Sequence, residues 1–574
     1  MLSSFFPRRG SAQSAGTNFA DDSKAVSYDD PKSEGDDLAY AQMLGAGEGA
    51  AGITAGGELT LEEDAAGGLG RHLGVFSTTF LVVGRIIGTG IFSTPSSILS
   101  GVGSLGAAMM LWVLGTVLSF CGLFVWLEFA GLYPRSGGEK VYLEAVYRRP
   151  KLLATCLFAV NAIILGFTAS GCIVFASNIL VAAKHEVTTW NERGIAVAVI
   201  VVVTLIHGFT PKWGVRLMNL LGIFKVVILL LVVVSGWVVL GGGIKSIPDP
   251  KANFRNGFSG SSHSAYNYAS ALFKVLNSYA GWSNAAYVLN EVKNPVRTIK
   301  IAGPLGLSIC AVLYILANIS YFAAVSLPAL KESGVTVASY YFLVVFGEKA
   351  QRALSVFVAL SAFGNVLAVT FAQARVNQEL AKEGMLPFTE FFASNWPCGS
   401  PFAGLIVHLI PSLIIILGPP AKVAYPFILD VEGYPGQIIN LCKPALRMHP
   451  CLYDSLTSHS VAVVVLGLFY LRFRHPHLTR PFKVWLPAAF FFFVAACFLL
   501  VVPFLRPAGG VGDTPPLPYW LYPVVGIAVF AVGLIYWFVW RVAMPYLGKF
   551  HWEPTKVTLA DGTVATKYRR IKNE

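Results

Sequence analysis

The sequence predicts an all-α polytopic membrane protein with twelve transmembrane helices, arranged as a five-plus-five inverted repeat in which helices 1 and 6 are broken. Three observations carry this prediction. Of the 574 residues, 55% are hydrophobic and only 13% are charged, against about 25% charged residues in soluble proteins. Uncharged runs of about 20 residues recur, the length that crosses the hydrocarbon core as a helix. Glycine-rich or polar interruptions fall in the first and sixth runs, which occupy corresponding places in two repeats of five.

Residues 1–72 precede the first apolar run and predict a disordered cytoplasmic tail. They are rich in Gly, Ala, Ser and Asp, and they hold 12 acidic residues against 5 basic ones. Such a segment cannot bury enough apolar surface to fold, and it lacks the layout of a signal peptide. Residues 546–574 are expected to form a cytoplasmic C-terminal tail.

The transmembrane domain is predicted over residues 73–545, with both termini in the cytoplasm. Lys and Arg accumulate in cytoplasmic loops, and with an internal N-terminus the inner loops hold 16 of them against 10 in the outer loops. The expected spans are 73–99, 104–132, 152–183, 194–210, 215–241, 266–290, 301–327, 353–373, 402–418, 424–441 continued at 460–471, 485–505 and 519–543.

Residues 441–460 do not fit this pattern, because they split the tenth span and place charged side chains at membrane depth. A lipid-exposed charge there would cost several kcal/mol. One interpretation is an extra loop. The other, which we favour, is a segment absent from the native protein, such as a retained intron in the gene.

The stretch GRIIGTGIFSTPS at 84–96 interrupts the first span. Unwinding a helix inside lipid frees backbone groups, which is tolerated where they line a cavity or meet a polar ligand. The amides that start the second half-helix attract an anion such as a carboxylate, and glycine lets the ligand approach the backbone. We therefore expect an anion-binding turn formed by Ile87, Gly88, Thr89, Gly90 and Ile91.

The sixth span is interrupted in the same way at NSYAGWS, residues 277–283. Carbonyl groups freed at the end of its first half-helix favour a cation such as an ammonium group. An anion site beside a cation site suits a zwitterionic amino acid. Glycine also serves close helix packing in membranes, but two interruptions at corresponding places favour a binding site. The expected residues are Asn277, Ser278, Tyr279, Ala280 and Gly281.

Four further polar residues lie in or near the apolar runs. Ser361 and Asn365 are one turn apart and are expected to face the same cavity, although helix packing explains the pair equally well. Arg85 lies about one turn before the first break, where we expect it to gate the inner side of the cavity. Lys225 in the fifth span requires carbonyl or hydroxyl partners, unless its long side chain reaches the inner surface.

Other functional classes find little support in the sequence. There is no phosphate-binding G-x-x-x-x-G-K-[ST] motif, and the eight cysteines form no C-x-x-C pair. We expect no enzyme activity, no cofactor and no metal. The basic residues lie in short loops, so the expected partners are the lipid bilayer and a small molecule, with no nucleic acid.

Several motifs resemble those of a known superfamily. GTGIF, SYAGWSN, EVKNPVRTIK and PRSGGEKVYLEAVYRRP are similar to the amino acid–polyamine–organocation superfamily and to its L-type branch. The combination of GRIIGTGIFSTPS, PRSGGEKVYLE and SAFGNVLAVTFAQARVNQELAKEGMLP most resembles the fungal high-affinity methionine permeases. The resemblance covers about residues 72–545, apart from the anomalous segment.

This resemblance implies a secondary transporter that imports neutral L-amino acids, methionine foremost, across the plasma membrane by alternating access. Residues 88–91 match the carboxylate-binding turn of the family, and residues 278–280 match the stretch whose carbonyls hold the amino group. Asn277 stands where mammalian L-type relatives place a gating aromatic residue. Tyr279 and Trp282 are the candidates for that gating role here.

The resemblance also bears on coupling and partners. Lys225 stands where sodium-coupled relatives bind a sodium ion, which implies sodium-independent transport with protons as the candidate coupling ion. Mammalian L-type relatives bind a heavy chain through a cysteine after span 3, but residues 184–193 contain none, so we expect no disulfide-linked heavy chain. The alternatives are a transporter-like amino acid sensor, or a permease for another amine or polyamine, and a vacuolar rather than plasma membrane location.

Overall fold

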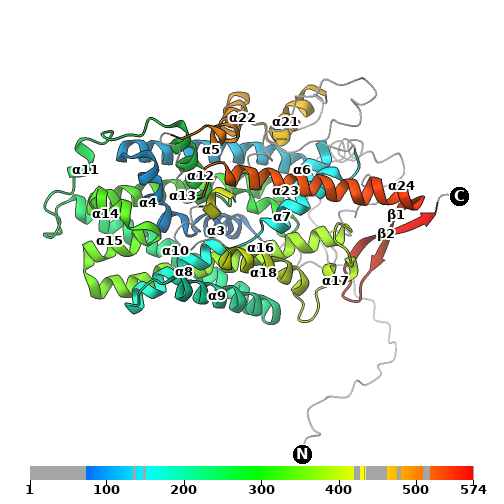
Figure 1. Ribbon diagram of the computed structural model, residues 1–574, viewed down its shortest axis with the longest axis horizontal. Helices are drawn as coiled ribbons and strands as arrows, with labels where there is room; N and C mark the ends of the chain where they lie inside the picture. Colours follow the sequence, from blue (N-terminus) through cyan, green and yellow to red (C-terminus); the bar gives the residue numbers. More distant parts are fainter. Residues whose placement is uncertain are drawn as a thin grey trace, which may run out of the picture.

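The computed structural model describes residues 73–133, 138–146, 150–418, 427–431, 434, 462–474, 480–507 and 517–572. Most of these residues belong to helices that pack into one bundle (Figure 1). The predicted tail at 1–72 and the anomalous segment at 441–460 lie outside the described residues, so both remain predictions.

Within the described residues, eight helical segments are long and apolar enough to cross a membrane. They are α5 (Leu105–Leu132), the pair α7 (Leu153–Ile164) and α8 (Ala169–Ala183), α9 (Thr189–Phe209), α10 (Pro211–Leu240), α13 (Pro295–Ala324), α16 (Glu348–Lys382), α22 (Leu486–Val501) with η3 (Val502–Phe504), and α23 (Leu521–Phe538) with η5 (Val539–Ala543) and α24 (Met544–Gly548). A ninth span is formed by α3 (Val75–Ile86) and α4 (Gly90–Val102), which are bent by 42° at the break between them. The chain is therefore a polytopic, predominantly helical membrane protein, as predicted.

The three remaining predicted spans contain shorter helices in the described part of the chain. Span 6 is covered by α12 (Ala265–Ser278) and the 3-10 helix η1 (Trp282–Glu291), span 9 by α18 (Phe402–Leu417), and part of span 10 by α21 (Ala462–Arg474). None of them passes as a full-length span on its own, so the count of twelve remains a prediction.

Short elements connect the spans at the two ends of the bundle. At one end lie α11 (Ala252–Arg255) and α14 (Leu327–Glu332), the latter followed by η2 (Gly334–Thr336) and α15 (Val337–Phe346). At the other end lie α6 (Glu139–Val146), α17 (Thr389–Ala393) and the C-terminal strands (Figure 1). The named connections that follow spans 5 and 7 thus lie at one end and those that follow spans 2 and 8 at the other, as successive crossings of a membrane require.

The helix α10 illustrates why these segments suit a membrane. Leu220, Ile223 and Val227 on one face are 64%, 56% and 56% exposed, although all three are apolar. Leu221 and Ile228 on the opposite face are buried in the protein. A helix that is apolar on both faces can place one face in lipid and the other in the protein core.

Two of the predicted spans differ from a continuous α-helix. Span 3, expected to run unbroken over 152–183, is interrupted between α7 and α8. Gly166 lies in this interruption against the side chain of Gln373, whose amide Nε2 donates to Ala162 O at 2.6 Å. In a continuous helix the amide of Gly166 would donate to this same Ala162 carbonyl. The hydrogen bond from Gln373 therefore replaces a bond of the helix. The second half of span 6 is a 3-10 helix rather than an α-helix.

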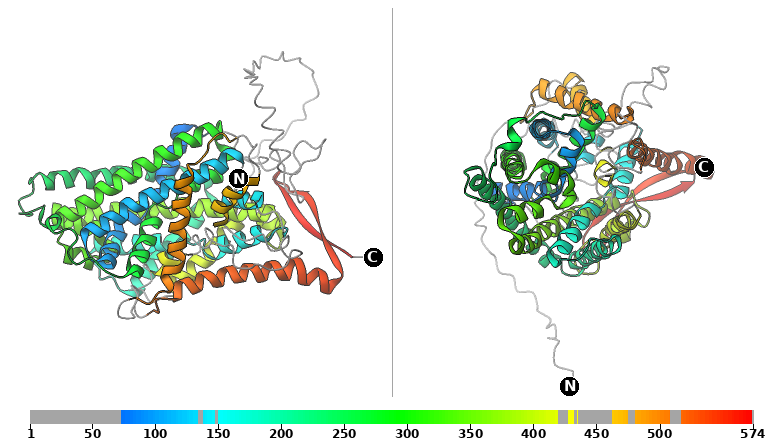
Figure 2. Two further views of the ribbon diagram at one scale, coloured as in Figure 1. Left: turned by 90° about the horizontal axis from the view of Figure 1, so that it is seen from above. Right: turned by 60° about the vertical axis from the view of Figure 1, so that its left-hand side comes forward.

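The expectation of an all-α chain is wrong at the C-terminus. There β1 (Phe550–Thr558) and β2 (Val564–Lys572) form an antiparallel hairpin beyond α24 (Figures 1 and 2). Every second side chain of a strand lies on the same face of the hairpin, and side chains of the two strands contact each other across that face. On one face the guanidinium of Arg570 lies 5.3 Å from the ring centroid of Phe550 and 5.4 Å from that of Trp552, at cation–π distance.

The hairpin is attached to the connection between α16 and α18. At its tip the backbone amide of Asn395 donates to the Asp561 carboxylate at 2.8 Å. Along β2 the ammonium of Lys567 donates to Glu390 at 2.8 Å, and this hydrogen bond lowers the pKa of the Glu390 carboxyl. The end of span 12 is consequently linked to the turn between spans 8 and 9.

Spans that are five apart in sequence order contact each other. α4 packs against α12, α3 against η1, α5 against α13, α8 against α16, and α9 against α18. Before α3, Leu73 forms a parallel bridge with Val292, and the Lys293 amide donates to Leu73 O at 2.8 Å. A five-plus-five repeat would bring these spans together, although the repeat itself remains a prediction.

Candidate functional site

The first break separates α3 from α4. Ile87 follows α3 with an extended backbone (φ −69°, ψ 90°), and its amide donates to Val83 O at 2.9 Å. The helix resumes at Gly90, after Gly88 and Thr89. Because the first amides of a helix have no acceptor within it, the start of α4 presents donors and the positive end of the helix dipole at the break.

The second break follows α12. Gly281 adopts φ +122°, a backbone conformation that favours glycine. A Cβ atom at this position would also lie 2.6 Å from Cγ of Arg85. Gly281 is therefore required both by its own backbone and by the side chain that packs on it. The last carbonyl groups of α12 lie beside it and carry the negative end of the helix dipole.

The two breaks are in direct contact. A Cβ atom at Gly90 would lie 2.6 Å from Oγ of Ser278, so only glycine allows the start of α4 to approach α12 this closely. Ser278 Oγ donates to Lys274 O at 2.8 Å, and it lies 3.0 Å from Oγ1 of Thr94. Hydroxyl groups of α4 and α12 thus hold the two breaks together.

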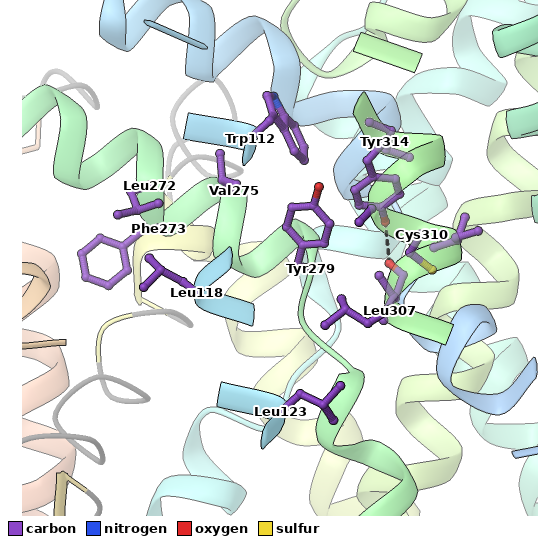
Figure 3. Close-up of a cluster of buried hydrophobic side chains, with 14 of the residues drawn as sticks. Trp112, Leu118, Leu123, Leu272, Phe273, Val275, Tyr279, Leu307, Cys310 and Tyr314 are labelled. Atoms are coloured by element: carbon purple, nitrogen blue, oxygen red, sulfur yellow. Dashed lines mark hydrogen bonds between the residues drawn. The ribbon is translucent and has the colours of Figure 1, made fainter. Parts of the chain in front are cut away.

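Tyr314 on α13 links the half-helices from the other side. Its hydroxyl lies 2.7 Å from the Ile86 carbonyl oxygen, at the end of α3, and 3.1 Å from that of Ser278, at the end of α12. A single buried donor thus serves the last carbonyls of both interrupted helices. Figure 3 shows the Tyr314 ring beside that of Tyr279. Sequence reasoning missed Tyr314, because its partners are remote in the chain.

A cavity of about 400 Å³ is lined by both breaks. Ten of the predicted site residues line it: Arg85, Gly88, Thr89, Gly90, Asn277, Ser278, Ala280, Gly281, Trp282 and Asn365. The structure therefore brings the two interrupted stretches and one residue of α16 to a common space.

Five predicted residues do not line this cavity, and Tyr279 is one of them. Its side chain is fully buried behind the break, between Trp112 and Tyr314, with ring centroids 5.8 and 5.1 Å away (Figure 3). Thr116 donates to its hydroxyl at 2.9 Å. Trp282, the other candidate gate, does line the cavity. The other four predicted residues that do not line the cavity are Ile87, Ile91, Ser361 and Lys225. Ile87 and Ile91 are buried in the core.

Asn365 and Ser361, which were predicted to face the same cavity from α16, differ in their positions. Asn365 faces the first break, and a Cβ atom at Gly88 would lie 3.0 Å from its Oδ1 atom. That oxygen is buried and has no hydrogen-bond partner among the described residues. Ser361 Oγ is likewise buried and unpartnered there, but it does not line the cavity.

Lys225 is buried in α10 and does not reach the inner surface. Its ammonium Nζ donates to Gly84 O at 3.0 Å, three residues before the first break begins. Its Cε atom would lie 3.1 Å from a Cβ atom at Gly364. The lysine therefore bridges α10 to α3, with α16 packed closely against it. Arg85, the predicted inner gate, lines the cavity and packs on Gly281.

A third interruption, which the sequence analysis missed, also lines the cavity. It comprises Gly166, Phe167 and Thr168, between α7 and α8. His408 of α18 supports it: Nδ1 contacts Gly166 O, and Nε2 lies 3.2 Å from Oγ1 of Thr168 and of Thr370. A carbonyl at Nδ1 requires the proton there, which leaves Nε2 to accept from the hydroxyls. The available signal was one glycine in an apolar run.

The arrangement suits a zwitterion better than a chemical reaction. The start of α4 favours an anion and the end of α12 favours a cation, and both border one cavity. In the part of the chain that the structure describes, no three His, Cys, Asp or Glu residues are placed to hold a metal ion. The site can therefore hold a small ligand that carries both charges.

Replacing Gly281 by alanine is expected to destabilise the protein, because the new Cβ must adopt φ +122° and displace Arg85. The strain should cost about 1–3 kcal/mol and lower the midpoint of thermal unfolding in detergent. Gly222→Ala on α10 is the matched control, since a Cβ there meets nothing within 4 Å. Equal midpoints for the two variants would contradict this account of Gly281.

Replacing Tyr314 by phenylalanine removes the hydroxyl that serves the carbonyls of Ile86 and Ser278. A buried acceptor left unsatisfied costs about 1–3 kcal/mol, so the first break should open more often. Amide hydrogen exchange in peptides that cover residues 84–92 is expected to accelerate. Exchange in α9, which is remote from Tyr314, provides the internal reference; unchanged rates around the break would count against the linking role.

Comparison with known proteins identifies the family. The sequence matches the amino acid permease family over residues 73–447. It is 38% identical to the high-affinity methionine permease of Saccharomyces cerevisiae over 506 residues, covering 88% of this chain and 85% of the yeast protein. The low-affinity methionine permease of the same yeast is 30% identical over 510 residues, covering 87% and 88%. The b(0,+)-type amino acid transporter 1 of Mus musculus is 27% identical over 481 residues, covering 82% and 88%. The chain therefore belongs to the amino acid permease family, whose members are transporters and not enzymes.

Proposed function

We propose that this chain is a secondary transporter that imports neutral L-amino acids, methionine foremost, across the plasma membrane, with both termini in the cytoplasm. The observation that carries the proposal is the shared cavity lined by the breaks of spans 1 and 6. The substrate carboxylate would bind the amides around Gly88 and Gly90, and the ammonium group would bind the carbonyls around Ser278. Residues 88–91 and 277–281 then hold the part of the substrate that all α-amino acids share.

The remaining wall of the cavity supports the proposal that the substrate has a neutral side chain. Its large side chains include Leu118, Trp126, Trp282 and Phe492, which suit an apolar ligand. Among the described residues of the lining, the charged ones are Arg85 and Glu139, one of each sign, so this part of the wall carries no net charge that would select a charged side chain. The names of the two yeast relatives support methionine in particular.

Alternating access is supported by the packing of the half-helices. The outer halves α4 and α12 contact each other, as do the inner halves α3 and η1. Each pair can move against the rest of the bundle while the breaks between them keep hold of the substrate. Trp282 and Arg85 line the cavity at the start and near the end of the inner halves, where a gate would act.

Sodium independence is supported by Lys225. Its Nζ atom donates to Gly84 O beside the first break, so a cationic side chain lies where a bound cation would otherwise stabilise the interrupted helix. We propose that Lys225 replaces the sodium ion of sodium-coupled transporters and that protons are the coupling ion.

The proposed function is tested with purified protein in liposomes that carry an inward proton gradient. Radiolabelled methionine is expected to accumulate inside, and unlabelled neutral amino acids should compete better than lysine, glutamate or a polyamine, because the cavity wall has no net charge. Saturable binding without accumulation would identify a sensor instead. Strongest competition by a polyamine would identify a permease for another amine.

Coupling is tested in the same liposomes. Replacing external sodium with choline is expected to leave methionine uptake unchanged, because Lys225 supplies the positive charge at the first break. A protonophore should abolish accumulation while leaving exchange of internal for external methionine intact. A large loss of uptake in choline would overturn the proposed role of Lys225.

A further inference from the structure

One wall of the cavity is formed by α5, a helix that contributes to neither break. Ser119 and Trp126 line the cavity from this helix. With Gly122 between them they are spaced i, i+3 and i+7, which places all three on one face of the helix. Gly115, one turn before Ser119, faces Val275 and Tyr279, so this face starts at the level of the second break.

Two hydrogen-bond donors on this face lack partners within the described residues. They are the hydroxyl of Ser119 and the indole N–H of Trp126, whose side chains belong to residues only 2% and 5% exposed. Buried polar groups are nearly always hydrogen-bonded, to protein, water or ligand. Two such donors on one wall of a cavity therefore indicate that the cavity receives an acceptor there.

Aromatic rings surround these donors. The side chain of a helical residue leans toward the preceding turn, so the Trp126 ring lies over the turn of Gly122, toward Ser119. The ring centroids of Trp126 and Trp282 are 5.3 Å apart at an interplanar angle of 89°. A Cβ atom at Gly122 would lie 2.9 Å from Cζ2 of Trp282 and 3.1 Å from Cζ of Phe492. The rings of Trp282 and Phe492 therefore pack on Gly122, where a larger residue would displace them.

We propose that Ser119, Trp126, Trp282 and Phe492 form the side-chain subsite, and that it selects an apolar side chain carrying a hydrogen-bond acceptor. A thioether meets both requirements, because its sulfur is a weak acceptor and contacts aromatic rings favourably. This inference rests on the proposed function, since it assigns the far end of the same amino acid whose charged groups bind the breaks.

The test compares uptake of methionine with that of norleucine, in which a methylene replaces the sulfur. The wild-type protein is expected to prefer methionine. In Ser119→Ala and in Trp126→Phe the preference should fall about two- to tenfold, the range expected for one lost hydrogen bond, because methionine uptake falls more than norleucine uptake. Trp112→Phe is the matched control: Trp112 is also a buried indole of α5 without a partner in the described chain, but it does not line the cavity.

The outcomes separate this inference from the proposed function. If the wild-type protein accumulates neither amino acid, the proposed function fails. If it accumulates both, and Ser119→Ala and Trp126→Phe leave the ratio as it is in Trp112→Phe, the function stands and the subsite is overturned. The two variants alter different side chains, so a folding defect in one, detected by its abundance, leaves the other to decide.

Discussion

A helix that is interrupted inside a membrane leaves backbone groups that lipid cannot satisfy, and the rest of this structure depends on how the chain satisfies them. The Tyr314 hydroxyl serves the carbonyls that end α3 and α12. The Lys225 ammonium donates to Gly84 O, two residues before the end of α3. The third interruption follows the same rule, with Gln373 bonded to Ala162 O and His408 to Gly166 O. All three breaks border the cavity, and neighbouring helices supply hydrogen-bond donors to these carbonyls.

These supports explain why spans 5, 7, 8 and 9 surround the breaks. Each sends a polar side chain into an otherwise apolar interface. Asn365 is different, since it projects from α16 into the cavity and its Oδ1 atom has no partner in the described chain. The same logic distinguishes groups that complete the scaffold, which are satisfied, from groups such as Asn365 Oδ1, Ser119 Oγ and Trp126 Nε1, which a substrate can satisfy.

Local patterns in the sequence were sufficient for the membrane class, the superfamily and both principal breaks. GTG and SYAG disrupt a helix by their own composition, so their positions could be predicted without knowledge of any neighbour. Tyr314 could not be found in this way, because its acceptor on Ile86 is 228 residues away. The break at Gly166 depends on Gln373, another remote partner. The C-terminal hairpin was not predicted, and residues 546–574 were expected to form a tail. Its aromatic and basic residues alternate along two strands and contact each other only when the strands pair.

The contact between Arg85 and Gly281 has a mechanical consequence. The half-helices α3 and η1 are joined at one end by this contact and at the other by the pairing of Leu73 with Val292 and Lys293. Two rods fastened at both ends cannot tilt independently. Any movement of one of these half-helices against the rest of the bundle must carry the other with it, and the bending must be confined to the few residues around Gly88 and Ala280, where the backbone is already free of helical constraint.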